Sequence, residues 1–318
     1  MASIPKLVIL LLCTCLHTLL AHGGDDLRTY KVLHAGALKS ATVNCSQPQV
    51  TPSYGGVTVP LHHRHGPCSP SPVPSTKAPT LQEMLRRDQL RAAYITRIQS
   101  ESGNLLEDQT DGLMGLGGGA ESLATQTAGT FGKAFSYCLP PTPDSSGFLT
   151  LGAATSGFVV KTPMLRSSEV PSYYGVRLQA IRVGGRQLSI PASVFSAGSI
   201  MDSGTIITRL PATAYSALSS AFKAGMKQYP PAQPMGIFDT CFDFSGQSSV
   251  SIPSVALVFS GGVVIDLATD GIILDSCLAF AANTDDSSLG IIGNVQQRTI
   301  EVLYDVGGGA VGFKAGAC

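Results

Sequence analysis

The 318-residue chain carries 21 Lys+Arg and 21 Asp+Glu, so its formal net charge is zero and only 13% of its residues are charged. With 35 Gly, 20 Pro and no Trp, this composition predicts a β-rich globular protein with many turns, and it excludes a coiled coil or a nucleic-acid-binding protein. The charge is uneven, because residues 1–101 carry 10 Lys+Arg against 5 Asp+Glu and residues 102–318 carry 11 against 16. The two parts are therefore expected to attract each other.

The first residues have the pattern of a secretory signal peptide. Lys6 precedes an apolar run over residues 7–20, which is shorter than the roughly 20 residues that a membrane span needs. The small residues Ala21 and Gly23 then suit cleavage by signal peptidase. We expect a signal peptide over residues 1–23 and entry into the secretory pathway; the alternative is an uncleaved anchor. No later run is long enough for a transmembrane helix.

The segment from residue 24 to 101 combines a Pro-rich stretch with one amphipathic helix. Residues 24–79 show no lasting period and are expected to be a solvated basic segment; their adjacent histidines and Cys68 lack the spacing of a zinc site. Residues 80–98 are expected to be helical, because Thr80 and Glu83 form a capping box ahead of a spaced apolar pattern. Arginines fill the remaining positions, so we expect this segment to be a basic propeptide that covers an acidic cleft. The alternative is an exposed amphipathic helix.

From residue 102 the sequence becomes Gly-rich, with short strand-like segments. Strands are expected at residues 135–139, 147–152 and 173–183. Hairpins are expected at Gly184-Gly185 and between residues 255–259 and 263–267, and a final alternating segment covers residues 298–313. Pro211 begins the one clear helix of this part, over residues 212–226.

Histidine usage narrows the chemistry that this part could perform. All six histidines lie before residue 66, so the later residues cannot supply a Ser–His, Cys–His or His-ligated zinc mechanism. Carboxylate chemistry is therefore the leading enzymatic option. The candidate is Asp202, which follows apolar residues and precedes Ser203, Gly204 and Thr205. Gly204 allows a tight turn, and the two hydroxyls could orient the carboxylate. The alternative is an ordinary Asp-Ser-Gly turn.

Several motifs together resemble the plant, nepenthesin-like branch of the pepsin-type aspartic proteases. They are residues 59–68 (VPLHHRHGPC), 111–117 (DGLMGLG), 135–139 (FSYCL), 201–205 (MDSGT) and 291–298 (IIGNVQQR). The resemblance implies an all-β dominated, bilobal fold, in which each lobe contributes one catalytic Asp-Thr/Ser-Gly loop locked by a later apolar-apolar-Gly strand. Asp202 with Ser203, Gly204 and Thr205 would be one such loop, and Ile291, Ile292 and Gly293 would lock it.

The resemblance also implies that most of the N-terminal lobe is missing. The closing piece Leu113-Met114-Gly115 is present, but no earlier aspartate precedes Ser-Gly or Thr-Gly. The expected organisation is a signal peptide (1–23), a propeptide (24–101), a remnant of the N-terminal lobe and interlobe sheet (102–165), and a complete C-terminal lobe (166–318). We call the last two parts the front remnant and the back lobe.

The family reaction uses a water held between two carboxylates that share one proton, without a metal or cofactor. The resemblance therefore implies a secreted aspartic endopeptidase zymogen, and with Asp202 alone this chain is expected to be inactive. As a particular chain it is expected to be a truncated product of this family, without a function of its own. The alternative is a non-catalytic binding protein, similar to xylanase inhibitors. We further expect that the protein takes a peptide or protein substrate and binds neither nucleic acid nor, after signal cleavage, a membrane. We also expect a monomer located in the apoplast or vacuole.

Two further expectations follow from the assignment of lobes. Cys241 and Cys277 bracket one hairpin of the back lobe and are expected to pair, which leaves Cys138 for Cys318. Cys45 and Cys68 would form a separate propeptide link. The opposite charges of the two parts suggest that the propeptide docks near neutral pH and is released by acid.

Overall fold

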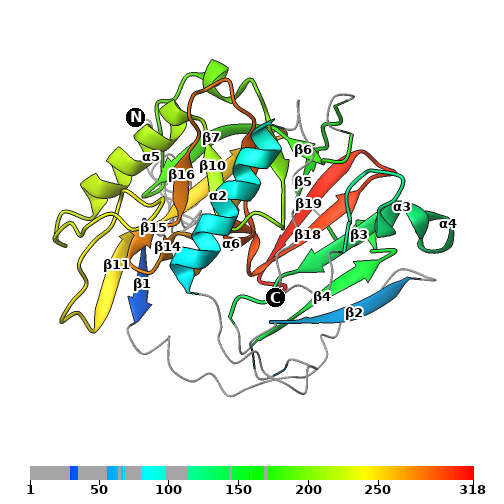
Figure 1. Ribbon diagram of the computed structural model, residues 1–318, viewed down its shortest axis with the longest axis horizontal. Helices are drawn as coiled ribbons and strands as arrows, with labels where there is room; N and C mark the ends of the chain where they lie inside the picture. Colours follow the sequence, from blue (N-terminus) through cyan, green and yellow to red (C-terminus); the bar gives the residue numbers. More distant parts are fainter. Residues whose placement is uncertain are drawn as a thin grey trace, which may run out of the picture.

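The computed structural model describes residues 29–34, 56–63, 66, 68, 80–97, 114–142, 145–158, 160–167 and 171–318. The expected signal peptide, Cys45, Asp111 and Leu113 lie outside these residues. Within the described residues, no helix combines the length and apolar character needed to cross a membrane. Strands dominate the fold, as the composition predicted (Figure 1).

The largest sheet has six antiparallel strands and joins distant parts of the sequence. Its order is β2 (Val57–His62), β4 (Ser146–Leu151), β3 (Ala134–Cys138), β18 (Ile300–Asp305), β19 (Ala310–Ala315) and β5 (Val160–Pro163). Strand β2 is an edge strand paired with β4 from Val57 to His62. The expectation that residues 24–79 form only a solvated segment was therefore wrong: Val57, Val59 and Leu61 alternate with other residues over six positions, too few to be recognised without the partner strand. Pro60 is tolerated because an edge strand leaves one side unpaired.

The back lobe contains two further sheets. The five-stranded sheet has the order β16 (Phe280–Ala282), β10 (Thr208–Leu210), β17 (Gly290–Ile292), β9 (Ser199–Met201) and β6 (Gly175–Val176). The four-stranded sheet has the order β13 (Val263–Asp266), β12 (Val255–Phe259), β7 (Leu178–Val183) and β8 (Arg186–Gln187). Gly184 and Gly185 adopt positive φ angles of 55° and 75° in the β7–β8 turn, which glycine permits at low cost. Helix α5 (Ala212–Gly225) follows Pro211, as expected.

The remaining elements are short. Strand β1 (Tyr30–His34) pairs with β11 (Ser249–Pro253), and β14 (Ile273–Leu274) pairs with β15 (Cys277–Leu278). The short helices are α3 (Leu123–Gln126), α4 (Ala128–Phe131), α6 (Asn294–Gln297), η1 (Thr155–Gly157), η2 (Ala192–Phe195) and η3 (Thr269–Gly271).

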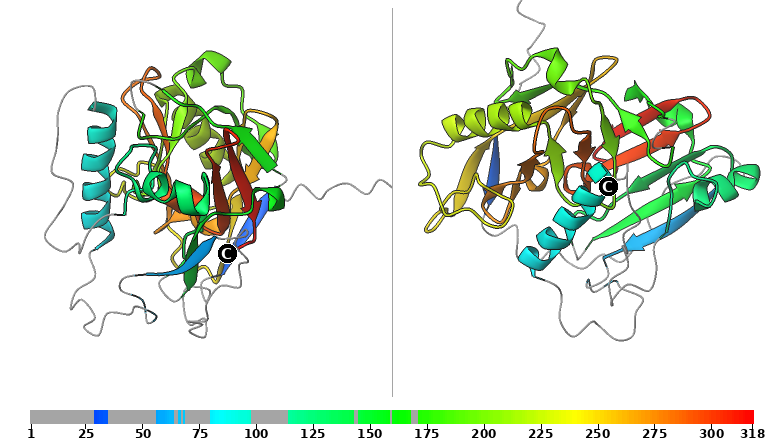
Figure 2. Two further views of the ribbon diagram at one scale, coloured as in Figure 1. Left: turned by 90° about the vertical axis from the view of Figure 1, so that its right-hand side faces the viewer. Right: turned by 45° about the horizontal axis from the view of Figure 1, so that its top comes forward.

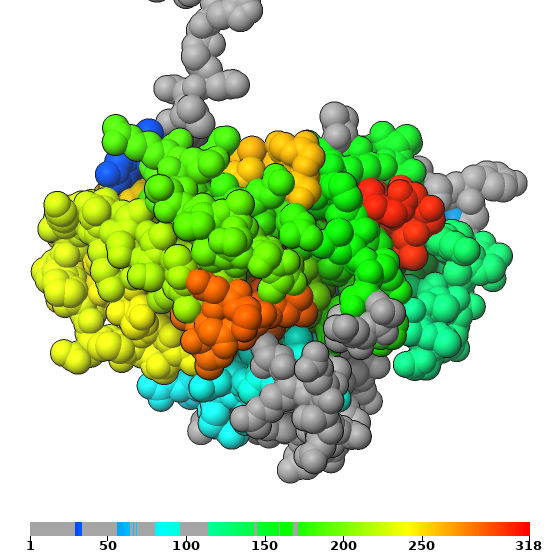
Figure 3. All heavy atoms as spheres, turned by 90° about the horizontal axis from the view of Figure 1, so that it is seen from above, coloured from blue at the N-terminus to red at the C-terminus, as the bar shows by residue number. Residues whose placement is uncertain are grey.

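One continuous hydrophobic core connects the front remnant to the back lobe. The same cluster holds Phe135 and Leu149 from β3 and β4, Phe222 from α5, and Phe259 and Phe313 from the back lobe. Figure 3 shows green residues, from the middle of the chain, adjoining the C-terminal residues in red, with the yellow residues on the opposite side of the view. The front remnant is therefore packed as part of the back lobe's core.

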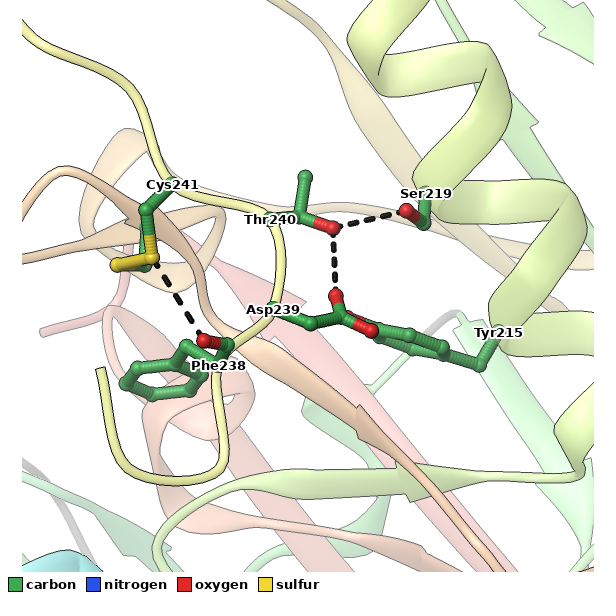
Figure 4. The surroundings of a disulfide bond; sticks show 7 residues. Tyr215, Ser219, Phe238, Asp239, Thr240 and Cys241 are labelled. Atoms are coloured by element: carbon green, nitrogen blue, oxygen red, sulfur yellow. Dashed lines mark hydrogen bonds between the residues drawn. A yellow bond between two sulfur atoms is a disulfide. The ribbon is translucent and has the colours of Figure 1, made fainter. Parts of the chain in front are cut away.

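The structure pairs Cys138 with Cys318 and Cys241 with Cys277, as expected. Cys68 is also disulfide-bonded, and its expected partner lies outside the described residues. Figure 4 shows the segment before Cys241 held against α5, because the Thr240 hydroxyl lies 2.8 Å from that of Ser219. The Thr240 hydroxyl also donates to Asp239.

Helix α2 (Leu81–Arg97) forms where the capping box predicted it. The Thr80 backbone N–H donates to Glu83 Oε2 over 2.7 Å, and the Glu83 N–H donates to Thr80 Oγ1 over 3.2 Å. The helix lies along one outer face of the molecule, in front of α6 in Figure 1 and at the left edge of the left view in Figure 2. Leu85, Ala92 and Ile95 are buried against the back lobe, so α2 is docked on it by one face.

Candidate active-site loop

Asp202 lies at the end of β9, in the turn that the sequence predicted. Its backbone N–H donates to the Ile292 carbonyl over 3.1 Å. The carboxylate accepts hydrogen bonds from the Gly204 N–H, over 3.1 Å, and from the Thr205 hydroxyl, over 2.6 Å. Asp202 is only 8% exposed. The loop thus holds the carboxylate in one orientation.

Ser203 does not share the role expected for it. It is exposed, and its carbonyl accepts a hydrogen bond of 3.1 Å from the Asn294 side chain. Among the described residues, the hydrogen-bond donors to the Asp202 carboxylate are Gly204, Thr205 and Arg91. The turn brings the Thr205 hydroxyl to the carboxylate, whereas the Ser203 side chain forms a hydrogen bond with Tyr137.

The strand expected to lock the loop lies beside it. Strand β17 runs parallel to β9, with Ile291 opposite Ile200 and Ile292 opposite Met201. Gly293 then approaches the far side of the loop so closely that an added Cβ would lie 2.7 Å from the Ile206 carbonyl oxygen. Real Cβ atoms essentially never make such a contact, so this position requires glycine.

Two glutamines that sequence reasoning overlooked complete the lock. Gln296 is buried; its Oε1 accepts hydrogen bonds from the N–H and hydroxyl of Thr208, and its Nε2 donates to the carbonyls of Gly271 and Ala279. Gln297 donates to the Ile292 carbonyl over 2.8 Å, the same carbonyl that accepts the Asp202 N–H. Two consecutive amides after an apolar strand were the available signal, since buried amides need partners.

The tyrosines of the six-stranded sheet continue this network under the loop. The Tyr137 hydroxyl donates to Gln297 Oε1 and lies 2.8 Å from the Tyr304 hydroxyl. The Phe135 and Tyr304 rings stack with centroids 4.6 Å apart. Burial raises the pKa of both Tyr137 and Tyr304, so both are neutral phenols in the physiological range.

Arg91 of α2 reaches the candidate catalytic carboxylate directly. Its Nε lies 3.1 Å from Asp202 Oδ2, and its Nη2 lies 2.9 Å from Asp202 Oδ1. This is the two-pronged geometry in which an arginine binds a carboxylate most strongly. The side chains are 26% and 9% exposed, respectively. The guanidinium also packs over Gly204, where an added Cβ would lie within 2.5 Å of Nη2.

A second ion pair anchors α2 next to the loop. Asp88 is 3% exposed, accepts a hydrogen bond from the Ile206 N–H, and lies 2.9 Å from Nη2 of the buried Arg209. Burial raises the pKa of Asp88, although the Ile206 N–H and Arg209 both oppose that effect. No local pattern indicated this pair, since Asp88 and Arg209 are 121 residues apart.

A cavity of about 260 Å³ lies beside the loop. Its lining includes Asp202, Arg91, Met114, Tyr173 and Tyr304, and Asp202 is the single carboxylate among the described residues that line it. Met114 and Gly115, from the expected closing strand of the front lobe, line this cavity without forming a strand, and Met114 is 62% exposed. Among the described residues, no strand pairs with Met114 and Gly115.

The fold and the clamped Asp-Ser-Gly loop define a pepsin-like, all-β acid protease scaffold. Solved structures with this fold include edgp (TM-score 0.58, 19% identity, 67% of this chain and 61% of that chain) and basic 7S globulin from soybean (TM-score 0.54, 23% identity, 69% and 60%). Family models match residues 40–153 (xylanase inhibitor N-terminal) and 173–315 (xylanase inhibitor C-terminal).

Relatives in plants give the family. An aspartyl protease family protein of Arabidopsis thaliana is 50% identical over 214 residues, which cover 65% of this chain and 45% of the relative. Aspartic proteinase nepenthesin-2 of Nepenthes gracilis is 36% identical over 223 residues, which cover 65% and 50%. The chain belongs to the plant, nepenthesin-like branch of the pepsin-type aspartic protease family. It spans about half the length of these curated relatives.

Proposed function

We propose that the chain is a secreted aspartic endopeptidase zymogen by descent, and that this form of it does not hydrolyse peptides. The observation that carries the proposal is that Asp202, paired with Arg91, is the single carboxylate among the described residues that line the cavity. In the family reaction, one carboxylate acts as base and the other as acid on a water between them, and like charges so close share a single proton. Here Asp202 faces a guanidinium, and no second carboxylate lines the described part of the cavity.

The chemistry of the pair adds to the effect of the missing second carboxylate. A carboxylate that accepts two hydrogen bonds from an arginine, one from Gly204 and one from Thr205 has its lone pairs engaged. The arginine contacts both carboxylate oxygens, so neither is open to a water held for attack. Loss of one essential catalytic group costs on the order of 10⁴-fold or more in other enzymes.

The remaining features of the proposal are those of a secreted precursor. Helix α2 acts as the inhibitory part of a propeptide, the protein is a monomer in the apoplast or vacuole, and an active relative of it would take a peptide or protein substrate. The disulfides are consistent with an oxidising compartment.

A second candidate is a non-catalytic binding protein. The two family models are described as xylanase inhibitor domains, which makes a glycosidase a reasonable class of partner. Tight binding to a glycosidase without peptide cleavage would favour this candidate.

The test uses purified full-length chain with a denatured globular substrate between roughly pH 3 and 6, where a shared-proton dyad works. We expect no pepstatin-sensitive cleavage by the wild type or by Arg91→Gln, which uncovers Asp202 without adding a second carboxylate. Cleavage that is first order in protein and disappears in Asp202→Asn would overturn the proposal. Cleavage that is second order in protein would instead indicate a dyad built from two Asp202 loops across a dimer axis.

A further inference from the structure

We propose that the Asp202 loop, together with Arg209, is a binding site for an amphipathic helix that carries an aspartate and, three residues later, an arginine. Helix α2 is the resident ligand, and Asp88 is the residue that sets the specificity. The inference rests on the proposed role of α2 as a cover for Asp202, and it adds which residues of the helix the loop recognises.

The spacing of the two charged residues on α2 matches two separate features of the loop. Residues three apart lie on the same face of a helix. Arg91 meets the Asp202 carboxylate at one end of the loop. Asp88 meets the Ile206 N–H and Arg209 at the other end. A ligand with the charges in the reverse order would place a cation against Arg209 and an anion against Asp202.

The apolar residues of α2 add area to the contact but little selectivity. Leu85 packs in a cluster with Ile207, Phe238 and Val295, whereas Ala92 and Ile95 pack with Ile200 and Ile291. These residues bury surface on both sides of the charged pair. Any amphipathic helix could supply similar contacts, so the charged residues must provide the discrimination.

Arg209 and the Ile206 N–H explain why an acidic side chain is required at position 88. Arg209 is 6% exposed, and its buried Nε has no hydrogen-bond partner among the described residues. Its Nη2 contacts Asp88, whose side chain is fully buried. Together with the Ile206 N–H, this nitrogen requires two acceptor oxygens at position 88. Asparagine has one acceptor oxygen and would turn its NH2 group toward a donor, so it should be rejected although it fits the same space.

The experiment measures peptide binding to the full-length chain in which the resident helix is weakened by Asp88→Asn and Arg91→Gln. A labelled peptide of residues 80–97, which includes the capping box, is titrated by fluorescence anisotropy. The peptides carrying Asp88→Asn or Arg91→Gln should bind about 100-fold more weakly or worse, as for removal of one partner of a buried pair. Gln82→Ala and Gln89→Ala, at exposed positions of α2, are the matched controls and should bind like the unaltered peptide.

The specificity is tested by crossing the peptides with a chain that also carries Arg209→Gln. On this chain the preference for the unaltered peptide over the Asp88→Asn peptide should fall to about fivefold or less, because the guanidinium that donates to the second carboxylate oxygen of Asp88 is gone. An unchanged preference on the Arg209→Gln chain would overturn the proposal. Equal binding of the two peptides to the chain that keeps Arg209 would overturn it as well.

If the Arg209→Gln chain does not fold, the comparison of peptides on the chain that keeps Arg209 still decides the proposal. All peptides in that comparison are measured on one and the same protein. The readout is binding and not cleavage. Peptide hydrolysis by the chain would therefore contradict the proposed function without affecting this result.

Discussion

At the residue scale, the surroundings of Asp202 show how a turn motif differs from a catalytic site. Gly204 and Thr205 fix the carboxylate as they would in an active enzyme, whereas Arg91 supplies a counter-charge where a shared proton would be needed. Asp88 is the less obvious residue, because its carboxylate is more deeply buried than that of Asp202. The electrostatic energy of α2 docking therefore depends on the buried Asp88 carboxylate, whose contribution cannot be estimated from the net charges of the two parts of the chain.

The pH dependence of Asp88 gives the first prediction. Its pKa is raised above 3.8 in the folded chain, so the folded state binds more protons than the unfolded state. The stability that this group contributes is complete below about pH 3.8 and is lost as the pH rises through the raised pKa. The free energy of unfolding of the wild type, relative to that of Asp88→Asn, should fall as the pH rises above about 4. Urea unfolding of both proteins measures it.

This sign is opposite to the acid release expected from the net charges of the two parts. A wild-type advantage that grows with pH would mean that the attraction of Arg209 outweighs the cost of burying Asp88. The control is Glu121→Gln, a carboxylate at an exposed position outside α2, which should not reproduce the trend.

At the element scale, β17 and α6 act as one unit that holds the loop. Strand β17 pairs with both β9 and β10, and α6 follows at once with Gln296 and Gln297. Gln297 joins the Ile292 carbonyl, and therefore the Asp202 backbone, to Tyr137 in β3. The position of the loop thus depends on the six-stranded sheet as well as on its own lobe.

Gly293 provides the prediction at this scale. Gly293→Ala should destabilise the chain by about 1–3 kcal/mol, because the added methyl overlaps the backbone of Ile206 to Thr208 and forces it to move. Gly157→Ala is the matched control, since a Cβ at that position meets nothing within 4 Å. Urea denaturation compares them, and equal midpoints for the two variants would show that the close approach of Gly293 is not needed.

At the scale of the whole molecule, the chain folds around one core although it spans about half the length of its curated relatives. Strands from the front remnant pair with β18 and β19 near the C-terminus. The boundary expected at residue 165 is therefore not a boundary of packing, because β5 and β19 lie side by side across it. The Cys138–Cys318 disulfide fastens the same two parts covalently.

Loss of this disulfide is the prediction at the whole-molecule scale. The two cysteines are 180 residues apart, and a loop of this length is expected to contribute about 5 kcal/mol in the chain-entropy model. Cys318→Ser should lower the free energy of unfolding by about 2–5 kcal/mol. Ala317→Ser, next to the bond, should leave it unchanged. A Cys318→Ser protein with the wild-type urea midpoint would show that the core alone fixes the C-terminus.

The sequence by itself determined the family, the Asp-Ser-Gly turn, helix α2, helix α5 and the hairpins. Each of these depends on short-range signals: a capping box, a proline at a helix start, glycines at turns and a motif around Asp202. Only the tertiary structure decided that β2 joins the six-stranded sheet, that Gln297 reaches Tyr137, and that Asp88 and Arg91 dock on the loop. Those contacts join residues more than 80 positions apart, and burial, which no local pattern encodes, gives them their energy.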